Sequence, residues 1–532
     1  MSSEAGGAVS LELEPERNAQ SHALARALVA HLAAAGVRNV VLCPGSRSAP
    51  LAYALADAER AGLLTLHVRV DERSAGFVAL GIATVHGTAA VVTTSGTAVA
   101  NLHPAVLEAS HAGRGLVVVS ADRPAELRGT GANQTTQQPG IFGAATRYDA
   151  DLPADTPLTS VRGTVARALA AARGAITRDP GPVLLNVQFR EPLGPPPERA
   201  LPAVVAGAKP IAVQAAVASV HYVPCVLDAA PRTVVIAGDG AGHEIAEVAE
   251  RAGWPLLAEP SSGARTAYSV TRYRDLLSTP IVDRVERVIV AGHPTLSRPV
   301  SKLLATTDAE IVIVSPGPRW TDVAAAATRV VPAIEVSGAA DPEWLARWRR
   351  ADAELAARSH PSAQQRAAEA IWRAGGNLVL GSSSTIRAFD ACAHGPQPRV
   401  WANRGLAGID GTISTAIGIA HALREPVRVV VGDLTFLHDA TALVRGLHEP
   451  DVDMQVIVFD DAGGSIFGSL EYGSQPGEEF ERLFATPQAL SIPALARSLG
   501  ADASECAPDT IANALAAPIV GRSVIRVPLE RS

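Results

Sequence analysis

Residues 427–464 read VRVVVGDLTFLHDATALVRGLHEPDVDMQVIVFDDAGG. Two apolar, β-branched runs, at 427–431 and 455–459, stand about one helix apart, and each is followed closely by aspartate and glycine. This spacing is typical of a βαβ unit, in which the two strands run parallel. The polar residues would then lie at the carboxyl ends of the strands, where parallel sheets bind their ligands.

The same alternation of β-branched runs with Ala- and Leu-rich stretches extends along almost the whole chain. It predicts an α/β fold with three doubly wound parallel-sheet domains, at residues 1–193, 203–345 and 355–532. The Pro-rich stretch 191–202 (EPLGPPPERALP) is expected to be a linker, and the helical stretch 341–374 is expected to contain the next boundary. We expect a helix over 18–35 and strands at 39–43, 66–70, 89–94, 116–121, 182–188, from 232, at 285–292, 311–315, 378–381, 400–402, 427–431, 455–459 and 523–527.

Composition excludes several classes of protein. The chain has 532 residues, 47% of them hydrophobic and 19% charged, which suffices for several buried cores. Its net charge of −7, without any Lys/Arg-rich run, argues against a nucleic-acid-binding protein. Four dispersed cysteines without CxxC spacing argue against a structural zinc site and a disulfide scaffold. Neither a signal peptide nor an integral membrane segment is expected, so a cytoplasmic location is predicted.

Both outer domains carry polar residues directly after their expected strands. In the N-terminal domain these are residues 44–48 (PGSRS), 71–73 (DER), 95–97 (SGT) and 122–124 (DRP). In the C-terminal domain they are residues 382–387, 403–405 (NRG), 432–434 (GDL) and 460–464. Each cluster alone could be a tight turn. Together they predict two rims of arginine, glycine and carboxylate that would form a site for an anionic ligand if they face each other.

Two of these clusters resemble the motif that holds magnesium diphosphate in thiamine-diphosphate enzymes. In that motif Gly-Asp-Gly follows one strand, and a second oxygen ligand follows the next strand; here Asp433 and Asp461 are 28 positions apart. The resemblance implies that Asp433, Asp461 and the main-chain carbonyl of Gly463 bind Mg²⁺, or Mn²⁺ in its place. Leu434 stands where the motif has its last glycine. Asp461 stands where Asn is commoner, which leaves Asp460 as an alternative ligand.

Longer motifs narrow the resemblance to one family. CPGSRSAPL (43–51), DERSAGFVALG (71–81), TSGTAVANLHPAVLEA (94–109), SADRPAELRGTGANQTTQQPGIFG (120–143), NRGLAGIDGTISTAIG (403–418) and GGSIFGSLE (463–471) together resemble MenD enzymes. This family comprises thiamine-diphosphate-dependent 2-succinyl-5-enolpyruvyl-6-hydroxy-3-cyclohexene-1-carboxylate synthases of menaquinone biosynthesis. The resemblance implies pyrimidine-binding (PYR), central and diphosphate-binding (PP) domains. It also implies decarboxylation of 2-oxoglutarate, 1,4-addition of the succinyl unit to isochorismate, and a homo-oligomer, a dimer of dimers, with sites between subunits.

The resemblance also assigns roles to single residues. Glu72 matches the glutamate that hydrogen-bonds the cofactor's pyrimidine N1′; on its own it could be a capping-region carboxylate of a helix that opens at Ser74. Ile409 matches the apolar residue that lies under the bent cofactor. The implied cofactor-binding set is Glu72, Thr97, Asn101, Ser383, Ile409, Gly432, Asp433, Leu434, Gly464 and Ile466.

The substrates are dianions, so several arginines are expected to bind them, and apolar side chains are expected to exclude water. Lys302 is a weaker candidate, because a surface lysine is at least as plausible at that position. The implied catalytic set is Glu72, Arg47, Asn133, Gln134, Arg387 and Arg404. The implied substrate-binding set is Ser46, Arg47, Arg123, Asn133, Gln134, Lys302, Ser383, Arg387, Arg404, Ile466, Phe467 and Leu470.

Three other functions compete with this one. A different thiamine-diphosphate carboligase or 2-oxo-acid decarboxylase would share the cofactor motifs, but it would need fewer arginines. A nicotinamide or FAD Rossmann protein is suggested by residues 238–242 (GDGAG), which we interpret as a turn because a lone glycine string is weak evidence. A non-catalytic binding relative is disfavoured by Glu72, Asp433 and the arginines.

Overall fold

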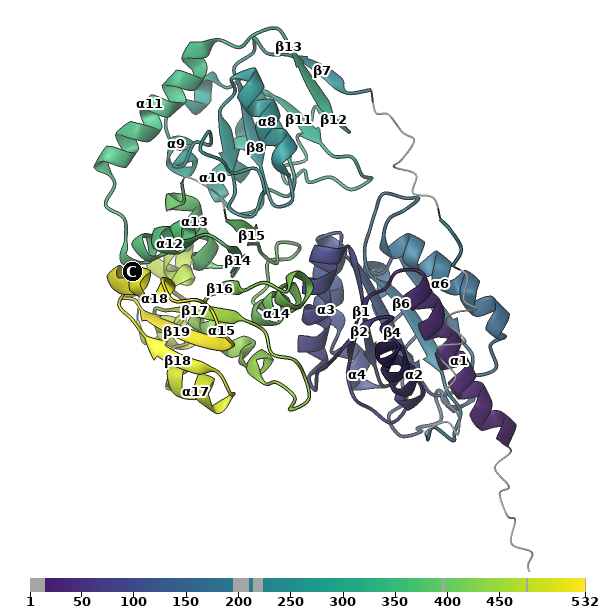
Figure 1. Ribbon diagram of the computed structural model, residues 1–532. Helices are drawn as coiled ribbons and strands as arrows, with labels where there is room; N and C mark the ends of the chain where they lie inside the picture. Colours follow the sequence, from purple (N-terminus) through teal and green to yellow (C-terminus); the bar gives the residue numbers. More distant parts are fainter. Residues whose placement is uncertain (1–14, 195–209, 214–222, 395–397, 475–476, 532) are drawn as a thin grey trace, which may run out of the picture.

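The computed structural model of the chain describes residues 15–194, 210–213, 223–394, 398–474 and 477–531. Three large sheets with flanking helices follow one another along the sequence (Figure 1), a two-stranded sheet accompanies the middle one, and the paired strands of all four are parallel. This confirms the predicted α/β class. Most of the expected linker, residues 195–202, lies outside the described residues.

The N-terminal domain is built on six strands, in the order β2-β1-β3-β4-β6-β5. Successive residues of its strands face opposite helix layers: Val117 packs toward α1, α2 and α6, whereas Val118 packs toward α3 and α5. The strands are therefore apolar on both faces, as expected for a covered parallel sheet. The strands are β1 (Asn39–Leu42), β2 (Thr65–Val68), β3 (Thr88–Thr93), β4 (Gly115–Asp122), β5 (Tyr148–Leu152) and β6 (Val183–Gln188). The helices are α1 (Pro15–Ala34), α2 (Ala49–Arg60), α3 (Glu72–His86), α4 (Thr97–Ala100), α5 (His103–His111) and α6 (Leu158–Ala172).

The middle domain has a five-stranded sheet, β12-β11-β10-β8-β9, and a two-stranded one, β13-β7. Helix α11 (Pro342–Arg358) packs on it through the buried Trp344 and Trp348, so the stretch expected to contain a boundary begins with a helix of this domain. The strands are β7 (Cys225–Asp228), β8 (Thr233–Ala237), β9 (Leu256–Ala258), β10 (Arg287–Ala291), β11 (Glu310–Val314), β12 (Arg329–Val331) and β13 (Ile334–Ser337). The other helices are α8 (His243–Ala252), α9 (Tyr273–Leu276) and α10 (Arg298–Thr306).

The C-terminal domain repeats the six-stranded pattern, in the order β15-β14-β16-β17-β19-β18. Helices α12 and α13 cover one face of this sheet and α14 and α17 the other. The strands are β14 (Asn377–Leu380), β15 (Arg399–Trp401), β16 (Val427–Gly432), β17 (Met454–Asp460), β18 (Asp502–Glu505) and β19 (Arg522–Pro528). The helices are α12 (Ala363–Ala374), α13 (Ser384–Cys392), α14 (Thr412–Leu423), α15 (Asp433–His438), α16 (Glu478–Phe480), α17 (Ile492–Ser498) and α18 (Ile511–Leu515).

One hydrophobic core spans the two outer domains, because α3 and α14 pack between their sheets (Figure 1). Glycine makes the close approach possible: a Cβ on Gly81 would lie 2.0 Å from the Thr415 carbonyl oxygen, and one on Gly418 would lie 2.0 Å from that of Val78. At the start of both helices the hydroxyls of Ser74 and Ser414 are 2.9 Å apart. The outer domains are thus fixed against each other within one chain.

Every strand expected from the sequence is present, with ends shifted by a few residues at most. Within the described ranges six further strands were not expected: β5, β7, β9, β12, β13 and β18. β5, β9, β12 and β18 lie at sheet edges, and β7 and β13 form the two-stranded sheet. Edge strands such as YDADL and DASE carry polar residues, so they lack the apolar run on which the prediction relied.

Candidate active site

Two buried carboxylates lie at the carboxyl ends of neighbouring strands. Asp433 follows β16 and Asp461 follows β17; their exposed fractions are 5% and 8%. Asp433 Oδ1 accepts a hydrogen bond from the Leu434 amide at 2.8 Å, and the Ser465 hydroxyl donates to Asp461 Oδ2. Burial, together with the charges of Asp461 and Asp460, raises the pKa of Asp433 to about 6. This pair would be stabilised by a cation.

Asp460, the alternative ligand, is already engaged. Its Oδ2 accepts a hydrogen bond from Arg526 Nε at 2.5 Å, and its Oδ1 accepts one from the Ala462 amide at 3.1 Å. Among the described residues Asp461 forms no ion pair; burial raises its pKa, and the nearby Arg531 charge offsets this only in part. The geometry therefore favours Asp461 over Asp460 as the partner of Asp433.

The turn after Asp461 leaves no room for side chains at its two glycines. Gly463 has φ of 126°, and a Cβ there would lie 2.2 Å from the Ala485 carbonyl oxygen. A Cβ on Gly464 would lie 2.6 Å from the Phe467 ring. Ile466, Phe467 and Leu470, the expected apolar wall, follow directly and are half-buried.

Glu72 is the first residue of α3, and the helix is capped by its neighbour. Asp71 accepts hydrogen bonds from the amides of Arg73 (2.9 Å) and Ser74 (3.3 Å). The capping role considered for Glu72 therefore belongs to Asp71. No hydrogen bond or ion pair occupies the Glu72 carboxylate within the described part of the chain. The expected cofactor residues Thr97 and Asn101 are exposed one turn apart on α4 and at its end.

The expected cations of the N-terminal domain lie at the carboxyl ends of its strands. Arg123 Nη1 donates to the Ser95 hydroxyl and to the Gln134 carbonyl, both at 2.6 Å. The Gln134 side chain donates back to the Ser95 carbonyl at 3.0 Å. Gln134 has φ of 54°, a left-handed backbone conformation that is costly for a non-glycine residue. Its neighbour Asn133 is exposed, as is Ser46.

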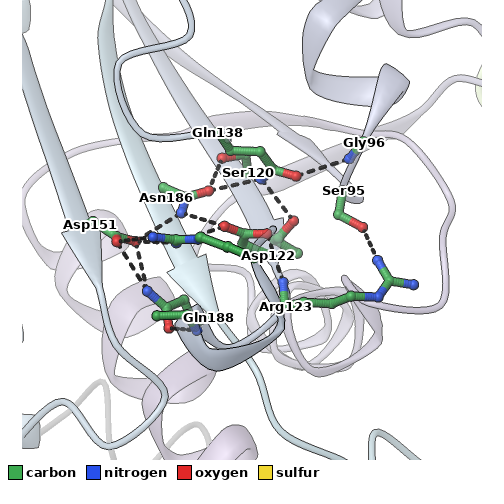
Figure 2. A network of polar contacts seen from close by, with 12 residues as sticks. Ser95, Gly96, Ser120, Asp122, Arg123, Gln138, Asp151, Asn186 and Gln188 are labelled. Carbon is green, nitrogen blue, oxygen red and sulfur yellow. Dashed lines mark hydrogen bonds and ion pairs between the residues drawn. The ribbon is translucent and has the colours of Figure 1, made fainter. Parts of the chain in front are cut away.

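A buried polar network behind this loop was missed from the sequence (Figure 2). Gln138 accepts a hydrogen bond from the Gly96 amide (2.9 Å) and donates to Asn186 (2.8 Å). Asn186 in turn donates to Asp122 at 2.9 Å and to Asp151 at 2.8 Å. The available signal was the pair of polar residues, Asn186 and Gln188, inside the otherwise apolar β6. Asp122 and Gln138 of this network flank residues 123–137, so the network holds both ends of the segment that carries Arg123 and Gln134.

Arg47 is 8% exposed, and its guanidinium is held at the end of β6. Nη1 donates to the Phe189 carbonyl at 2.8 Å, and Nη2 pairs with Glu191 at 3.1 Å. Its hydrogen bonds, like those of Arg123 and Gln134, stay within the N-terminal domain. Burial and the nearby Arg123 lower the pKa of Arg47.

In the C-terminal domain, Ser383 precedes α13 and Arg387 lies one turn into it. Arg387 Nη1 donates to the Ser383 carbonyl at 2.8 Å. Arg404 is 3% exposed, and its Nη2 donates to Thr295 Oγ1 of the middle domain at 3.1 Å. Burial, followed by the charge of Arg404, lowers the pKa of Arg387. The two arginines therefore lie in one cluster.

Lys302 is not part of that cluster in the described structure. It is exposed on α10, whereas Arg298, at the start of the same helix, reaches Glu471 at 3.4 Å, next to the apolar wall. The glycine string 238–242 allows close packing of two loops, because a Cβ on Gly238 would lie 2.1 Å from Pro294 N. It brings β8 against the loop that carries Thr295.

Ile409 lies in the loop before α14 and is 36% exposed. A cavity of about 280 Å³ adjoins this loop, with Phe77, His103, Leu107, Leu406 and Asp410 among its lining residues. Glu108 of α5 ties the loop to the N-terminal domain by accepting hydrogen bonds from the amides of Gly405 (2.6 Å) and Leu406 (2.7 Å).

Within the described residues, no group of three or more His, Cys, Asp or Glu side chains is placed to hold a metal ion. A cation at Asp433 and Asp461 would need oxygen ligands from elsewhere as well. None of the helices in the described ranges has both the length and the apolar character that crossing a bilayer requires.

Comparison with known proteins gives matches over both outer domains and over the chain as a whole. Residues 22–141 match the thiamine pyrophosphate enzyme N-terminal TPP binding domain, and residues 382–527 match the corresponding C-terminal TPP binding domain. Three curated relatives are each named 2-succinyl-5-enolpyruvyl-6-hydroxy-3-cyclohexene-1-carboxylate synthase. That of Kineococcus radiotolerans is 49% identical over 93% of both chains. That of Nocardioides sp. is 47% identical over 89% of this chain and 88% of its own. That of Arthrobacter sp. is 45% identical over 96% and 89%.

Proposed function

Because the chain belongs to the MenD family of thiamine-diphosphate enzymes, the 2-succinyl-5-enolpyruvyl-6-hydroxy-3-cyclohexene-1-carboxylate synthases of menaquinone biosynthesis, we propose roles for its residues in that family's reaction. The reaction decarboxylates 2-oxoglutarate and adds the succinyl unit to isochorismate. The observation that carries the proposal is the pair of buried carboxylates, Asp433 and Asp461, at the ends of adjacent strands. A cytoplasmic location stays a prediction.

The residues present fit the diphosphate end of the cofactor with its metal ion. Asp433 and Asp461 would supply two anionic oxygens, and the Gly463 carbonyl a third, to Mg²⁺ or Mn²⁺. Phosphate oxygens would complete the shell. The metal in turn would neutralise two carboxylates whose burial disfavours their charged forms.

When bound, thiamine diphosphate supplies the electron sink that makes loss of carbon dioxide possible. Glu72 would hold a proton shared with the pyrimidine N1′, because its carboxylate has no partner among the described residues and stands at the open end of α3. Ile409, Ile466, Phe467 and Leu470 would keep water away from the reacting atoms. The other residues expected to contact the cofactor are Thr97, Asn101, Gly432, Leu434 and Gly464.

Two groups of cations would hold the substrate carboxylates. The N-terminal group is Arg123 with Asn133 and Gln134 of the following segment and with Ser46, which follows β1. The C-terminal group is Arg387 and Arg404 with Ser383. Arg47 would bind a carboxylate by exchanging its contact with Glu191, whose side chain is 73% exposed and therefore weakly held. Lys302 has no support from the structure for such a role.

We propose further that the site is completed between two copies of the chain. Apolar side chains beside the proposed site are exposed in a single chain: Val70, two residues before Glu72, is 81% exposed, and Leu406 is 52% exposed. Exposed apolar groups around a polar site are typical of an interface. A dimer of dimers would cover them.

Co-expression of two inactive variants tests this assembly. At a thiamine-diphosphate concentration too low to load Asp433→Ala, Glu72→Gln and Asp433→Ala subunits should each give homodimers with little activity. Mixed dimers contain one intact site and one doubly altered site. Since half of randomly formed dimers are mixed, about a quarter of wild-type activity should return. Recovery at that level supports a site shared between chains. No recovery, with mixed dimers demonstrated by affinity tags, would place Glu72 and Asp433 of one chain in the same site.

A further inference from the structure

The middle domain contacts both C-terminal segments that present arginines. Tyr273 and Arg265 of the middle domain reach α13, which carries Arg387, and Thr295 reaches Arg404. These contacts join residues more than a hundred positions apart in the sequence. The motifs of the cofactor site assign no role to the middle domain.

The first contact centres on Asp390, which lies three residues after Arg387 on α13 and is fully buried. The Tyr273 hydroxyl lies 2.9 Å from both carboxylate oxygens of Asp390 and donates to them. Arg265 Nη1 donates to Asp390 Oδ1 at 3.1 Å. Both partners are themselves buried, with exposed fractions of 1% and 3%. These hydrogen bonds to a buried carboxylate hold the Asp390 side chain in one position.

Arg265 also binds the end of the same helix. Its Nη2 donates to the Asp390 carbonyl at 2.9 Å, and its Nε donates to the Ala393 carbonyl at 3.1 Å. These are among the carbonyls that a helix leaves without partners in its last turn. Arg274 Nη1 adds a contact to the Arg387 carbonyl at 3.3 Å. The middle domain therefore holds α13 by its side chains and by its main chain.

The second contact is direct. Thr295 Oγ1 accepts a hydrogen bond from Arg404 Nη2 at 3.1 Å. The neighbouring Leu296 holds Thr295 in place. The Leu296 amide donates a hydrogen bond of 2.9 Å to Oε1 of Glu259, which follows β9. The glycine at position 238 lets this loop lie against β8. Arg404 is thus oriented by the carboxyl edge of the middle sheet.

We propose that the middle domain positions Arg387 and Arg404 for the substrate carboxylates, with Tyr273 acting through Asp390 and Thr295 acting directly on Arg404. The inference rests on the function proposed above, because it takes both arginines as substrate ligands. Tyr273 and Thr295 are positioning residues that do not touch substrate. An arginine displaced by a fraction of an ångström loses bidentate geometry.

Single-atom variants test the proposal in the full-length holoenzyme. Tyr273→Phe and Thr295→Val each remove one hydroxyl at almost constant volume. Tyr268→Phe is the matched control, since the Tyr268 hydroxyl bonds the carbonyls of Ala249 and Trp254 within the middle domain. Thr295→Ser restores the acceptor. We expect Tyr273→Phe and Thr295→Val to raise KM for 2-oxoglutarate or isochorismate roughly 5- to 30-fold. The Kd for thiamine diphosphate should stay within about twofold, and Tyr268→Phe and Thr295→Ser should match wild type.

A readout without substrate accompanies the kinetics. Amide hydrogen exchange in residues 384–392 should be faster in Tyr273→Phe than in wild type or Tyr268→Phe, in protein free of cofactor. Wild-type KM values in both Tyr273→Phe and Thr295→Val would overturn the proposal, as would an equal rise in Tyr268→Phe. Failure of the wild type to consume the two substrates would instead overturn the proposed function, before any variant is compared.

Discussion

Asp71 caps α3 and thereby leaves the carboxylate of the next residue, Glu72, without a partner in the described part of the chain. Neighbouring carboxylates thus have separate roles: Asp71 caps the start of the helix, and Glu72 is available to a ligand. The first turn of α3 is also held to the C-terminal domain, because Arg73 donates to the His438 carbonyl at 2.7 Å. Glu72 is therefore presented from a fixed backbone.

Glu72→Gln should keep the fold and lower turnover by roughly 10²-fold or more, the usual scale for losing a proton-transfer group. Glutamine preserves size but cannot share a proton with a ring nitrogen. Steady-state kinetics and thermal unfolding measure the two effects. Asp71→Asn, which keeps a capping oxygen, is the control and should retain most activity. Near-normal turnover in Glu72→Gln would remove Glu72 from the mechanism.

Asp461→Ala and Asp433→Ala should each weaken Mg²⁺-dependent binding of thiamine diphosphate at least tenfold, with little loss of thermal stability in cofactor-free protein. The reason is that burial disfavours the charged form of both carboxylates, so each would be stabilised by a bound divalent cation. Asp460→Asn should instead lower the thermal stability of the cofactor-free protein and leave the cofactor affinity nearly unchanged, because Asp460 pairs with Arg526. A fluorescence titration with and without Mg²⁺ measures the affinity. Cofactor binding that depends on Asp460 and tolerates loss of Asp461 would reverse our assignment.

Gly81→Ala should destabilise the protein by about 1–3 kcal/mol, because the new methyl group would collide with the Thr415 carbonyl and push α3 from α14. Gly163→Ala in α6 is the matched change, since the three atoms nearest to its Cβ all belong to the Arg167 side chain, the closest at 3.5 Å. That variant should be stabilised by about 0.5–1 kcal/mol. Urea unfolding of both variants measures the difference. Equal effects would show that the two helices do not need the close approach.

Glu259→Gln should change how stability depends on pH. Burial raises the pKa of Glu259 to about 8, against an ordinary value of 4.5; Arg404 faces this carboxyl, as do Asp390 and Asp239. Between those two values the folded protein keeps a proton that the unfolded chain releases, so stability falls as pH rises. Wild type should lose up to about 1.4 kcal/mol per pH unit relative to Glu259→Gln in this window. Parallel stability curves from urea unfolding would show that Glu259 ionises normally.

The sequence predicts what local patterns encode. Apolar runs place the central strands, and motif spacing points to Asp433 and Asp461, which the structure brings together. Local patterns do not reveal contacts between distant segments. Tyr273 and Asp390 are 117 positions apart, and neither belongs to a motif. Gln138 belongs to the motif at residues 120–143, but its hydrogen bond with Gly96 depends on tertiary packing.

The central claim is best tested by one assay of the purified protein with thiamine diphosphate, Mg²⁺ and 2-oxoglutarate, with and without isochorismate. Consumption of 2-oxoglutarate and release of carbon dioxide should depend on isochorismate, and mass spectrometry should detect the succinylated cyclohexene product. If carbon dioxide is released from another 2-oxo acid without any dependence on isochorismate, the protein is a neighbouring decarboxylase or carboligase and our account of its arginines is wrong.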